Sequence, residues 1–546
     1  MPTQATSNGL FKRTLDFLDK AHDGAHGGTR ANFRLVHGNA DLHEEQGKLI
    51  TGLDGLEAQF DDDDRDDGKK GQRVRTLRWF LPRKRSLLAP YGLGTVDQAF
   101  LGVLYARHFF LRLFGLTGKT IIFDEVHAYD LYMSRLFVRL LEWLNALGTH
   151  VILLSATLPA KLREHCFKAW QAMPAEALPP PIDTPYPAVW TAYDGSYRLA
   201  AGNFDTFWTQ HALLKRHDPD PEAVAASVAQ ALQGGATVGV ICNTVRRAQA
   251  VYQATRDLLN GHKDTLLLFH ARYRFCERNR REQDALDRFG TERDSGKGRA
   301  LIATQVAEQS LDLDFDVLFT DLAPIDLLLQ RAGRLHRHLM LRPSATRPDG
   351  YRQPTVFWLC PEAEPDSLPD MRSLGVSTTR FSVYEPLIVW KSWLLLHERD
   401  AWSLPADYRL LIEQVYDDGN HPPSGLTNSA LKAWQAAVTF LKKNEDQAKW
   451  AAKDQLIEKP NIRGMKRLLT KPRMELADSD DEDVHKTRRA LTRQGSDSIE
   501  LIILYEDEQE RLYPGLFISA ITKAKGITTA PESMCINVCM APVSAD

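Results

Sequence analysis

Short apolar runs alternate with amphipathic stretches in two parts of the chain. In the first part, residues 120–123 and 151–154 are typical of buried strands, and Gly148 ends an apolar helical stripe between them. The stripe consists of Leu136, Phe137, Leu140, Leu141, Leu144 and Leu147. In the second part, strands are predicted at 237–241, 265–269, 300–303 and 317–320, with helical segments between them. Apolar strands that alternate with helices favour parallel sheets covered on both faces, so the pattern predicts two tandem α/β lobes.

The pattern changes at a few places that suggest domain limits. Five prolines between 179 and 187 interrupt the first block, and after about 345 the periodicity is mixed. Residues 400–455 look mainly helical, and 499–505 resemble a strand. We therefore expect a first lobe over 1–190, a second lobe over 191–345, a linker over 346–400, and a mixed, mainly helical accessory domain over 401–546.

Composition is that of a globular protein, with 546 residues, 43% of them hydrophobic, and a net charge of −3. The six cysteines form no CxxC pair, which argues against a zinc site and favours a reducing, cytoplasmic location. No signal peptide or long apolar span is present, so no membrane contact is expected.

The acidic clusters at 61–67 and 475–483 are typical of an exposed loop and a linker. The basic stretch at 69–85 contains Trp79 and Phe80, and fits either a nucleic-acid backbone or a charged insertion.

The first chemical signal is the pair Asp124 and Glu125, which directly follows a predicted strand. Ligands bind at the carboxyl ends of strands in open α/β sheets. Two carboxylates at that position suit nucleotide hydrolysis, one holding Mg²⁺ and the other orienting the attacking water. A pair that merely caps the next helix would look similar.

Two further signals follow. Ser155, Ala156 and Thr157 come directly after the strand at 151–154, which would place them beside the acidic pair. The segment from Gln330 to Arg337 is predicted to be helical, with Arg334 and Arg337 on one face. Guanidiniums can stabilise the charge on a transferring phosphate, although a plain basic helix surface would also explain them. Gly333 inside a helix would cost about 1 kcal/mol and requires a reason such as close backbone approach.

Together these signals resemble the motifs of superfamily 2 helicases, and they occur in the same order. Residues 303–312 resemble the fifth motif, Cys242-Asn243-Thr244 the fourth, and residues 2–7 and 95–98 the motifs that grip the tracking strand. The run from Asp124 to Asp130 and the segments at 384–387 and 404–408 narrow the resemblance to the CRISPR-associated helicase-nuclease of type I interference systems. The similarity covers about residues 1–520.

The resemblance implies two RecA-like lobes that hold ATP and Mg²⁺ between acidic groups of one lobe and guanidiniums of the other. Asp124 would hold Mg²⁺, Glu125 would activate water, and His127 would act beside them. Gln330, Arg334 and Arg337 would contact the γ-phosphate, with Asp312 also at the nucleotide. Ser155 and Thr157, with His127, would couple lobe closure to DNA. The expected contacts to single-stranded DNA are Thr3, Thr6, Thr95, Gln98 and Thr304. The family translocates 3′ to 5′ after recruitment by a crRNA-guided surveillance complex.

Two parts of the family pattern are missing from the sequence. There is no GxxxxGK[ST] phosphate loop; Gly118-Lys119-Thr120 has Leu113 where the first glycine belongs, and it precedes a strand instead of following one. The only His-Asp dipeptides, at 22–23 and 217–218, lie in polar surroundings, so no nuclease is expected. We interpret the sequence as truncated at its start. The alternative functions are a catalytically silent nucleic-acid-binding fragment, or half of a split helicase whose phosphate loop and nuclease come from a separate polypeptide. A third possibility is a related superfamily 2 RNA helicase.

Overall fold

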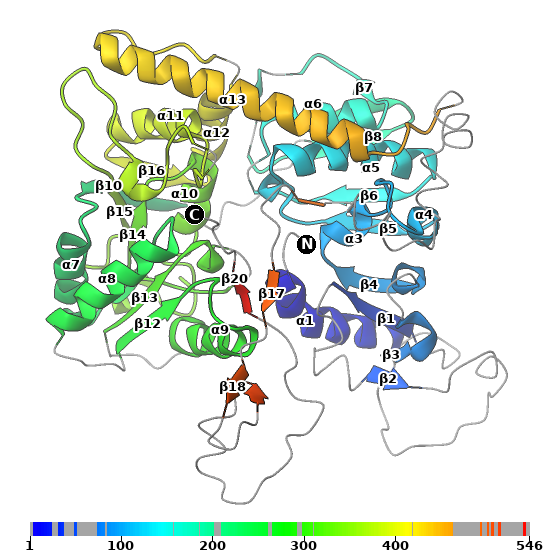
Figure 1. The fold of residues 1–546 in the computed structure, drawn as a ribbon, viewed down its shortest axis with the longest axis horizontal. Coiled ribbons are helices and arrows are strands. Elements are labelled where there is room, and N and C mark those ends of the chain that lie inside the picture. The colour runs from blue at the N-terminus through cyan, green and yellow to red at the C-terminus, as the bar shows by residue number, and fades with distance from the viewer. Residues whose placement is uncertain are drawn as a thin grey trace, which may run out of the picture. The chain divides into compact units, whose positions relative to one another are not determined.

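The structure, a computed structural model, forms two compact units, and each is described by itself (Figure 1). Unit 1 comprises residues 1–205, 412–416 and 439–494, and unit 2 comprises residues 206–411, 417–438 and 495–546. The residues that the structure describes are 4–23, 31–37, 49–51, 74–81, 85–156, 158–178, 180–184, 186–200, 209–259, 265–291, 298–308, 311–379, 381–417, 419–461, 492–493, 499–501, 504–506, 512–514 and 539–541. The clusters at 61–67 and 475–483 lie outside them.

Unit 1 contains three small sheets. The first is wholly parallel, in the order β2 (Ile50–Thr51), β3 (Val74–Leu77), β1 (Ala31–Val36) and β4 (Tyr91–Gly94). The second pairs β5 (Thr120–Phe123) with β6 (His150–Leu153), also in parallel. The third joins β7 (Met173–Pro174), β9 (Ser196–Ala200) and β8 (Val189–Tyr193). The strands predicted at 120–123 and 151–154 are therefore confirmed, the second shifted by one residue.

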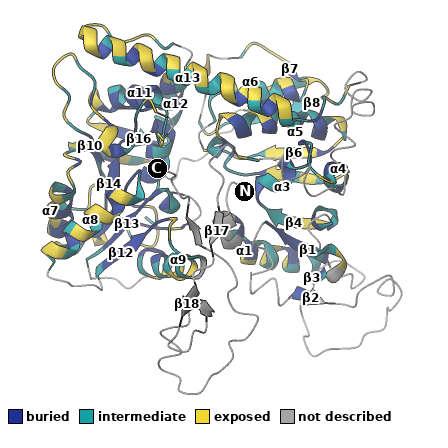
Figure 2. Cartoon of the chain, viewed as in Figure 1, coloured by how far each residue is buried: buried dark blue, intermediate teal, exposed yellow. Residues whose placement is uncertain are grey.

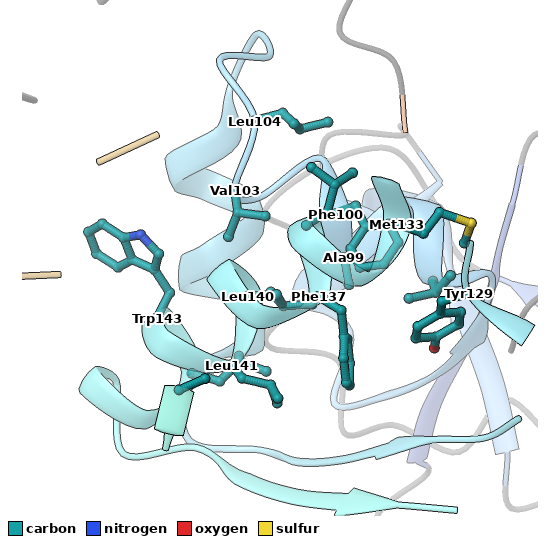
Figure 3. Close-up of a cluster of buried hydrophobic side chains, with 14 of the residues drawn as sticks. Ala99, Phe100, Val103, Leu104, Tyr129, Met133, Phe137, Leu140, Leu141 and Trp143 are labelled. Carbon is teal, nitrogen blue, oxygen red and sulfur yellow. The ribbon is translucent and has the colours of Figure 1, made fainter. Parts of the chain in front are cut away.

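The helices of unit 1 are α1 (Gln4–Asp23), α3 (Val96–Phe100), α4 (Phe109–Leu116), α5 (Leu131–Ala146) and α6 (Ala160–Ala169). Helix α5 begins at Asp130, whose carboxylate accepts the N–H of Met133 at 2.7 Å, as an N-cap does. Gly148 ends the helical segment with φ +66°, a conformation that glycine adopts without a Cβ penalty. The predicted apolar stripe is buried in the core of this unit, where Phe137 packs edge-on against Phe123 and Tyr129 (Figure 3).

Unit 2 is built on one seven-stranded sheet. Its order is β12 (Leu266–Phe269), β13 (Arg299–Ala303), β11 (Thr237–Ile241), β14 (Val317–Asp321), β15 (Thr355–Leu359), β10 (Gln210–His217) and β16 (Ala401–Leu404). All neighbours are parallel except β16, which runs antiparallel to β10. Every residue of β11 and β14 is buried, as expected for central strands of a parallel sheet. The α/β class with parallel sheets is confirmed.

Helices accompany this sheet, and α7 and α8 expose residues to solvent along one side while α10 and α11 are almost wholly buried or half-buried (Figure 2). They are α7 (Pro221–Gln233), α8 (Val245–Leu258), α9 (Phe275–Phe289), α10 (Ile325–Ala332) and α11 (Pro386–His397). Two helices contain residues of both units: α12 (Tyr408–Tyr416) and α13 (Asn428–Gln455). In α13, Trp434 is buried within unit 2 and Ala448 joins the core of unit 1. Short strands follow at β17 (Ile499–Leu501), β18 (Leu504–Glu506), β19 (Leu512–Pro514) and β20 (Cys539–Ala541).

The compact units differ from the expected domain limits at three places. Residues 401–546, expected to form one accessory domain, are divided between the two units, and 401–404 form β16 of the seven-stranded sheet. Unit 1 continues past residue 190 because the β8–β9 hairpin packs on α6: the rings of Phe167 and Tyr197 stack at 3.8 Å, and the Arg163 guanidinium lies 4.4 Å from the centre of the Trp190 ring. Residues 346–400, expected to be a linker, provide β15 in the interior of the sheet and also α11. Among the described residues, no helix has both the length and the apolar character that a bilayer crossing requires.

Candidate functional site

The acidic pair lies at the carboxyl end of β5, as the sequence predicts. The N–H of Leu154 donates to Phe123 O at 2.8 Å and the N–H of Val126 donates to Leu154 O at 3.2 Å, so the chain turns sharply beside the end of β6. Glu125 has φ +55°, which is unusual for a residue with a side chain and is worth noting at a functional turn. Its N–H donates to Asp124 Oδ1 at 3.0 Å. Both carboxylates are half-buried, so they remain accessible at the strand end.

His127 connects this turn to the next strand end. Its Nδ1 lies 2.9 Å from Ser155 Oγ, and its Nε2 lies 3.3 Å from Glu125 Oε2. The imidazole therefore links the acidic turn after β5 with the Ser155 turn after β6, two positions that are 28 residues apart in sequence. A hydrogen-bonded link of this kind can carry a shift of one turn to the other. Thr157 lies outside the described residues.

A second group of predicted residues lies at the end of β4. Thr95 is buried and precedes α3, and Gln98 Oε1 accepts a hydrogen bond from Arg112 Nη1 at 3.2 Å. Between them, Asp97 pairs with Arg493, whose Nε and Nη2 donate to its two carboxylate oxygens at 3.0 and 2.9 Å. Arg493 could not be predicted from the sequence, because its partner is 396 positions away. Thr3 is outside the described residues, and Thr6 lies in α1.

The Gly118-Lys119-Thr120 segment does not have the geometry of a phosphate loop. Lys119 Nζ donates to the carbonyl oxygens of Leu87 and Ala89, each at 2.6 Å. Burial lowers the pKa of this ammonium to about 8. Thr120 is already the first residue of β5, so the segment precedes a strand instead of opening a helix. These contacts agree with the interpretation of the segment as a chance match.

The structure corrects the prediction for the arginine segment in unit 2. Helix α10 ends at Ala332 and Gly333 is its C-cap, so Arg334 and Arg337 do not share a helix face. The helix ends because Leu335 pairs with Phe315: the N–H of Phe315 donates to Arg334 O and the N–H of His336 donates to Phe315 O, both at 2.9 Å. Gly333 therefore lies at the helix end, where its helix-interior cost does not arise.

The three predicted side chains of this segment have different environments. Arg334 is buried and its Nη2 donates to Glu308 O at 2.8 Å. Arg337 is exposed, and its Nε lies 2.6 Å from Asp312 Oδ1, an oxygen that also lies 2.9 Å from His338 Nε2. Although partial burial opposes it, the hydrogen bond with His338 and the Arg337 guanidinium lower the pKa of Asp312. Gln330 is half-buried, and its Nε2 has no hydrogen-bond partner among the described residues.

The residue that sequence reasoning missed is Arg331. It is fully buried, and its guanidinium contacts Glu308 Oε1, Thr320 Oγ1, Asp321 O, Asn243 Oδ1 and Tyr384 Oη. Burial lowers the pKa of Arg331 and the Glu308 carboxylate raises it, and the carboxylate prevails. Burial also raises the pKa of Glu308, against the opposing guanidinium, and we infer an ion pair from the 2.6 Å contact between Arg331 Nε and Glu308 Oε1. The available signal was an arginine inside an apolar helical stripe, which requires a buried acidic partner. Thr304 is buried at the start of the 3₁₀ turn Gln305–Ala307, which leads to Glu308.

The acidic turn of unit 1 could hold a divalent cation together with a nucleotide. Mg²⁺ in such sites is held by one or two carboxylates plus substrate phosphates, and two half-buried carboxylates fit that requirement. Among the described residues, no group of three or more His, Cys, Asp or Glu side chains is arranged to hold a metal ion. His22 instead lies 3.2 Å from the Tyr91 hydroxyl, and His217 Nε2 lies 2.8 Å from Ser227 Oγ.

Comparisons with known proteins point to one family. The family model described as CRISPR-associated nuclease/helicase Cas3, C-terminal, matches residues 234–340. The endonuclease/helicase Cas3 of Thermus thermophilus is 34% identical over 562 aligned positions, covering 95% of this chain and 56% of that protein. The Escherichia coli protein of the same description is 31% identical, with 80% and 46% covered. This chain thus spans about half the length of these curated relatives.

Solved structures agree with the sequence matches. A crystal structure described as T. fusca Cas3-ATP is 28% identical, with a TM-score of 0.73 over 94% of this chain and 54% of that one. A structure described as a CRISPR RNA-guided surveillance complex, pre-nicking, contains a chain that matches with a TM-score of 0.59 and 28% identity, over 85% of this chain and 53% of that one.

Proposed function

This chain belongs to the Cas3 family of CRISPR-associated helicases, and we propose that it acts as an ATP-dependent DNA helicase or translocase in type I interference. In this proposal the chain unwinds target DNA after recruitment by a crRNA-guided surveillance complex. The support is the similarity along nearly the whole chain to Cas3 proteins, one of which was solved in a form described as Cas3-ATP. We also propose a cytoplasmic location, from the low cysteine content.

In unit 1, we propose that Asp124 holds Mg²⁺ and that Glu125 orients and deprotonates the attacking water. When bound, Mg²⁺ would neutralise charge on the phosphates. His127 contacts both Glu125 and Ser155, so a movement of the acidic turn would be transmitted through its side chain to the end of β6. These contacts carry the roles proposed for the acidic turn, because they join two predicted motifs through one side chain.

In unit 2, we propose that Gln330, Arg334 and Arg337 contact the nucleotide phosphates, with Asp312 also at the nucleotide. Arg337 is exposed and would exchange its surface ion pair for a phosphate at little cost. For single-stranded DNA, the proposed contacts are Thr3, Thr6, Thr95, Gln98 and Thr304, with Thr157 and Ser155 in the coupling path. Hydroxyl and amide groups suit phosphate oxygens, which fix position without reading sequence.

The test is ATP turnover by this polypeptide with and without single-stranded DNA. The Glu125→Gln variant should lose at least about a hundredfold of the stimulated rate, the scale of a missing general base. Glu398→Gln is the matched control, because Glu398 is an exposed glutamate of unit 2. Turnover that is equal in Glu125→Gln and in the wild type would refute the assigned role.

A second candidate function is an enzyme half that is completed by a separate polypeptide, and one observation favours it. The strands β5 and β6 turn one face to the core and leave the other bare: Ile122, Ile152 and Leu154 are 55%, 44% and 47% exposed. Parallel strands are normally covered on both faces. We propose that a strand and helix from another chain cover this face.

This candidate has its own experiment. The part of the Thermus thermophilus relative without a counterpart here would be added as a separate polypeptide, and ATP turnover would be measured. Restored turnover that Ile152→Ser weakens would support completion in trans. Ile182→Ser, a comparably exposed isoleucine elsewhere in unit 1, is the control. If turnover is full without the added polypeptide, or if Ile152→Ser has no effect, this second function fails.

A further inference from the structure

The loop that leads from β15 to α11 makes contacts that none of the proposed roles use. Its described residues 371–379 and 381–386, which we name the clasp, are hydrogen-bonded to one another. The N–H of Val383 donates to Gly375 O at 2.9 Å, and the N–H of Ser377 donates to Ser382 Oγ at 2.9 Å. Ser382 Oγ in turn donates to Tyr384 O at 2.6 Å. The clasp is therefore a loop whose two segments are held together by hydrogen bonds.

One end of the clasp is fastened to the segment after β11. Asn243 Nδ2 donates to Leu374 O at 3.2 Å. Gly375 has φ +78°, and a Cβ on it would lie 2.6 Å from Thr244 Cγ2. Both the conformation and the close approach require glycine here, so the loop lies directly against Thr244.

The other end is fastened by a hydroxyl group. Tyr384 Oη accepts hydrogen bonds from Arg331 Nη2 at 3.0 Å and from Gln305 Nε2 at 3.1 Å. Gln305 Nε2 also donates to Asn243 O at 2.8 Å. Burial raises the pKa of Tyr384, so its hydroxyl stays neutral and can accept from a cation at ordinary pH. One oxygen thus joins the turn after β13 to helix α10.

The turn that Tyr384 holds connects two residues with different proposed roles. Thr304, a proposed DNA contact, begins the turn, and its carbonyl accepts the N–H of Ala307 at 3.1 Å. At the other end of the turn, Glu308 O accepts from Arg334 Nη2, and Glu308 Oε1 pairs with Arg331. A displacement at Thr304 would therefore reach both arginines within unit 2. Tyr384 fixes Gln305, the residue in between.

We propose that Tyr384 is a positioning residue that holds the Thr304–Gln305 turn against Arg331, so that DNA bound at Thr304 sets the position of Arg334. This inference rests on the proposed function, because it takes the roles of Thr304 and Arg334 from it. Removing the hydroxyl leaves the ring in place but removes the acceptor that Gln305 and Arg331 share, so that of these contacts only the Glu308 pair with Arg331 still joins the turn to α10. The clasp then no longer transmits DNA binding to the phosphate-contacting side chains.

The experiment compares Tyr384→Phe with Tyr351→Phe, a tyrosine of the same unit that is also half-buried. Basal and poly(dT)-stimulated ATP turnover are measured, together with hydrogen–deuterium exchange of peptides covering 304–308 and 331–336. Tyr384→Phe should lower the ratio of stimulated to basal turnover about tenfold, the scale of one hydrogen bond to a charged group. Basal turnover should stay within about twofold, and Tyr351→Phe should change neither quantity.

Hydrogen–deuterium exchange distinguishes a failure of this inference from a failure of the proposed function. In the wild type, poly(dT) should protect the 331–336 peptide, and in Tyr384→Phe that protection should be lost while protection of 304–308 remains. If the wild type hydrolyses no ATP but shows this pattern, the proposed helicase activity fails and the positioning role stands. If poly(dT) protects 331–336 equally in both proteins, or protects it in neither, the positioning role is refuted.

Discussion

His336 should make unit 2 sensitive to mild acid. Its side chain is 2% exposed, and its Nε2 lies 3.2 Å from Asp316 O. Its Nδ1 has no hydrogen-bond partner among the described residues, so a second proton there would be buried without an acceptor. Burial, followed by the Arg347 guanidinium, lowers the pKa of His336 to about 4, although Asp314 and Asp316 oppose the shift.

The direction in which folding stability changes with pH follows from proton linkage. Between pH 6.5 and pH 4 the unfolded chain binds a proton at this histidine and the folded chain does not, so folding stability falls as the pH is lowered through this range. A shift from 6.5 to about 4 corresponds to about 3 kcal/mol when complete. Between pH 7.5 and pH 5 the expected loss is about 2 kcal/mol.

The assay is urea unfolding at pH 7.5 and pH 5 of the wild type and of His336→Asn. Asparagine tolerates the φ of +47° at this position and does not titrate. The difference in the free energy of unfolding between the wild type and the variant should therefore change by about 2 kcal/mol, against the wild type, at the lower pH. His421→Asn, an exposed histidine of the same unit, controls for general effects and should show no such change. A difference that stays constant with pH would refute the reasoning.

Three further outcomes are expected. Arg347→Met should lower the free energy of unfolding by about 3 kcal/mol, because the buried carboxylates Asp314 and Asp316 then lose a fully buried cation that pairs with both; a loss under about 1 kcal/mol in urea would contradict this. Asp130→Ala should cost about 1 kcal/mol in the same assay through the lost N-cap of α5, and an unchanged midpoint would speak against it. Lys119→Ala should leave the affinity for ATP unchanged, because its ammonium is bound to two backbone carbonyls; a tenfold weaker affinity by titration calorimetry would restore the phosphate-loop interpretation.

The central strands were predictable because they are short, largely apolar runs, and such runs indicate buried strands. The strand 237–241 is found as predicted, and the strands predicted at 300–303 and 317–320 are each one residue longer in the structure. The strands β10, β15 and β16 were missed, although they complete the same sheet. Strand β10 pairs with segments more than 130 residues away, and its only apolar residues are Ala212, Leu213 and Leu214, with polar residues on either side. Such partly covered strands give a weak apolar signal, so pairing and not pattern defines them.

The arginine segment shows why the candidate site was only partly predictable. Arg331, Arg334 and Arg337 recur every third position, which is the spacing of one helical face. In the structure, one is fully buried in an ion pair, one is buried against a carbonyl, and one is exposed. The difference arises from Phe315, whose backbone pairs with Leu335 and ends the helix between the first and second arginine.

The backbone pairing of Phe315 with Leu335 explains why charged side chains are buried near Phe315. Arg347 Nη1 donates to Phe315 O at 3.3 Å and lies 2.6 Å from Asp316 Oδ1, so an ion-paired arginine holds the residue whose backbone pairing ends α10. Buried ion pairs contribute little net stability compared with apolar packing, but they fix one arrangement. We therefore expect them where a backbone position must be defined. The loop from Arg334 to Arg337 is such a place, because a guanidinium that stabilises a phosphate must be held within a fraction of an ångström.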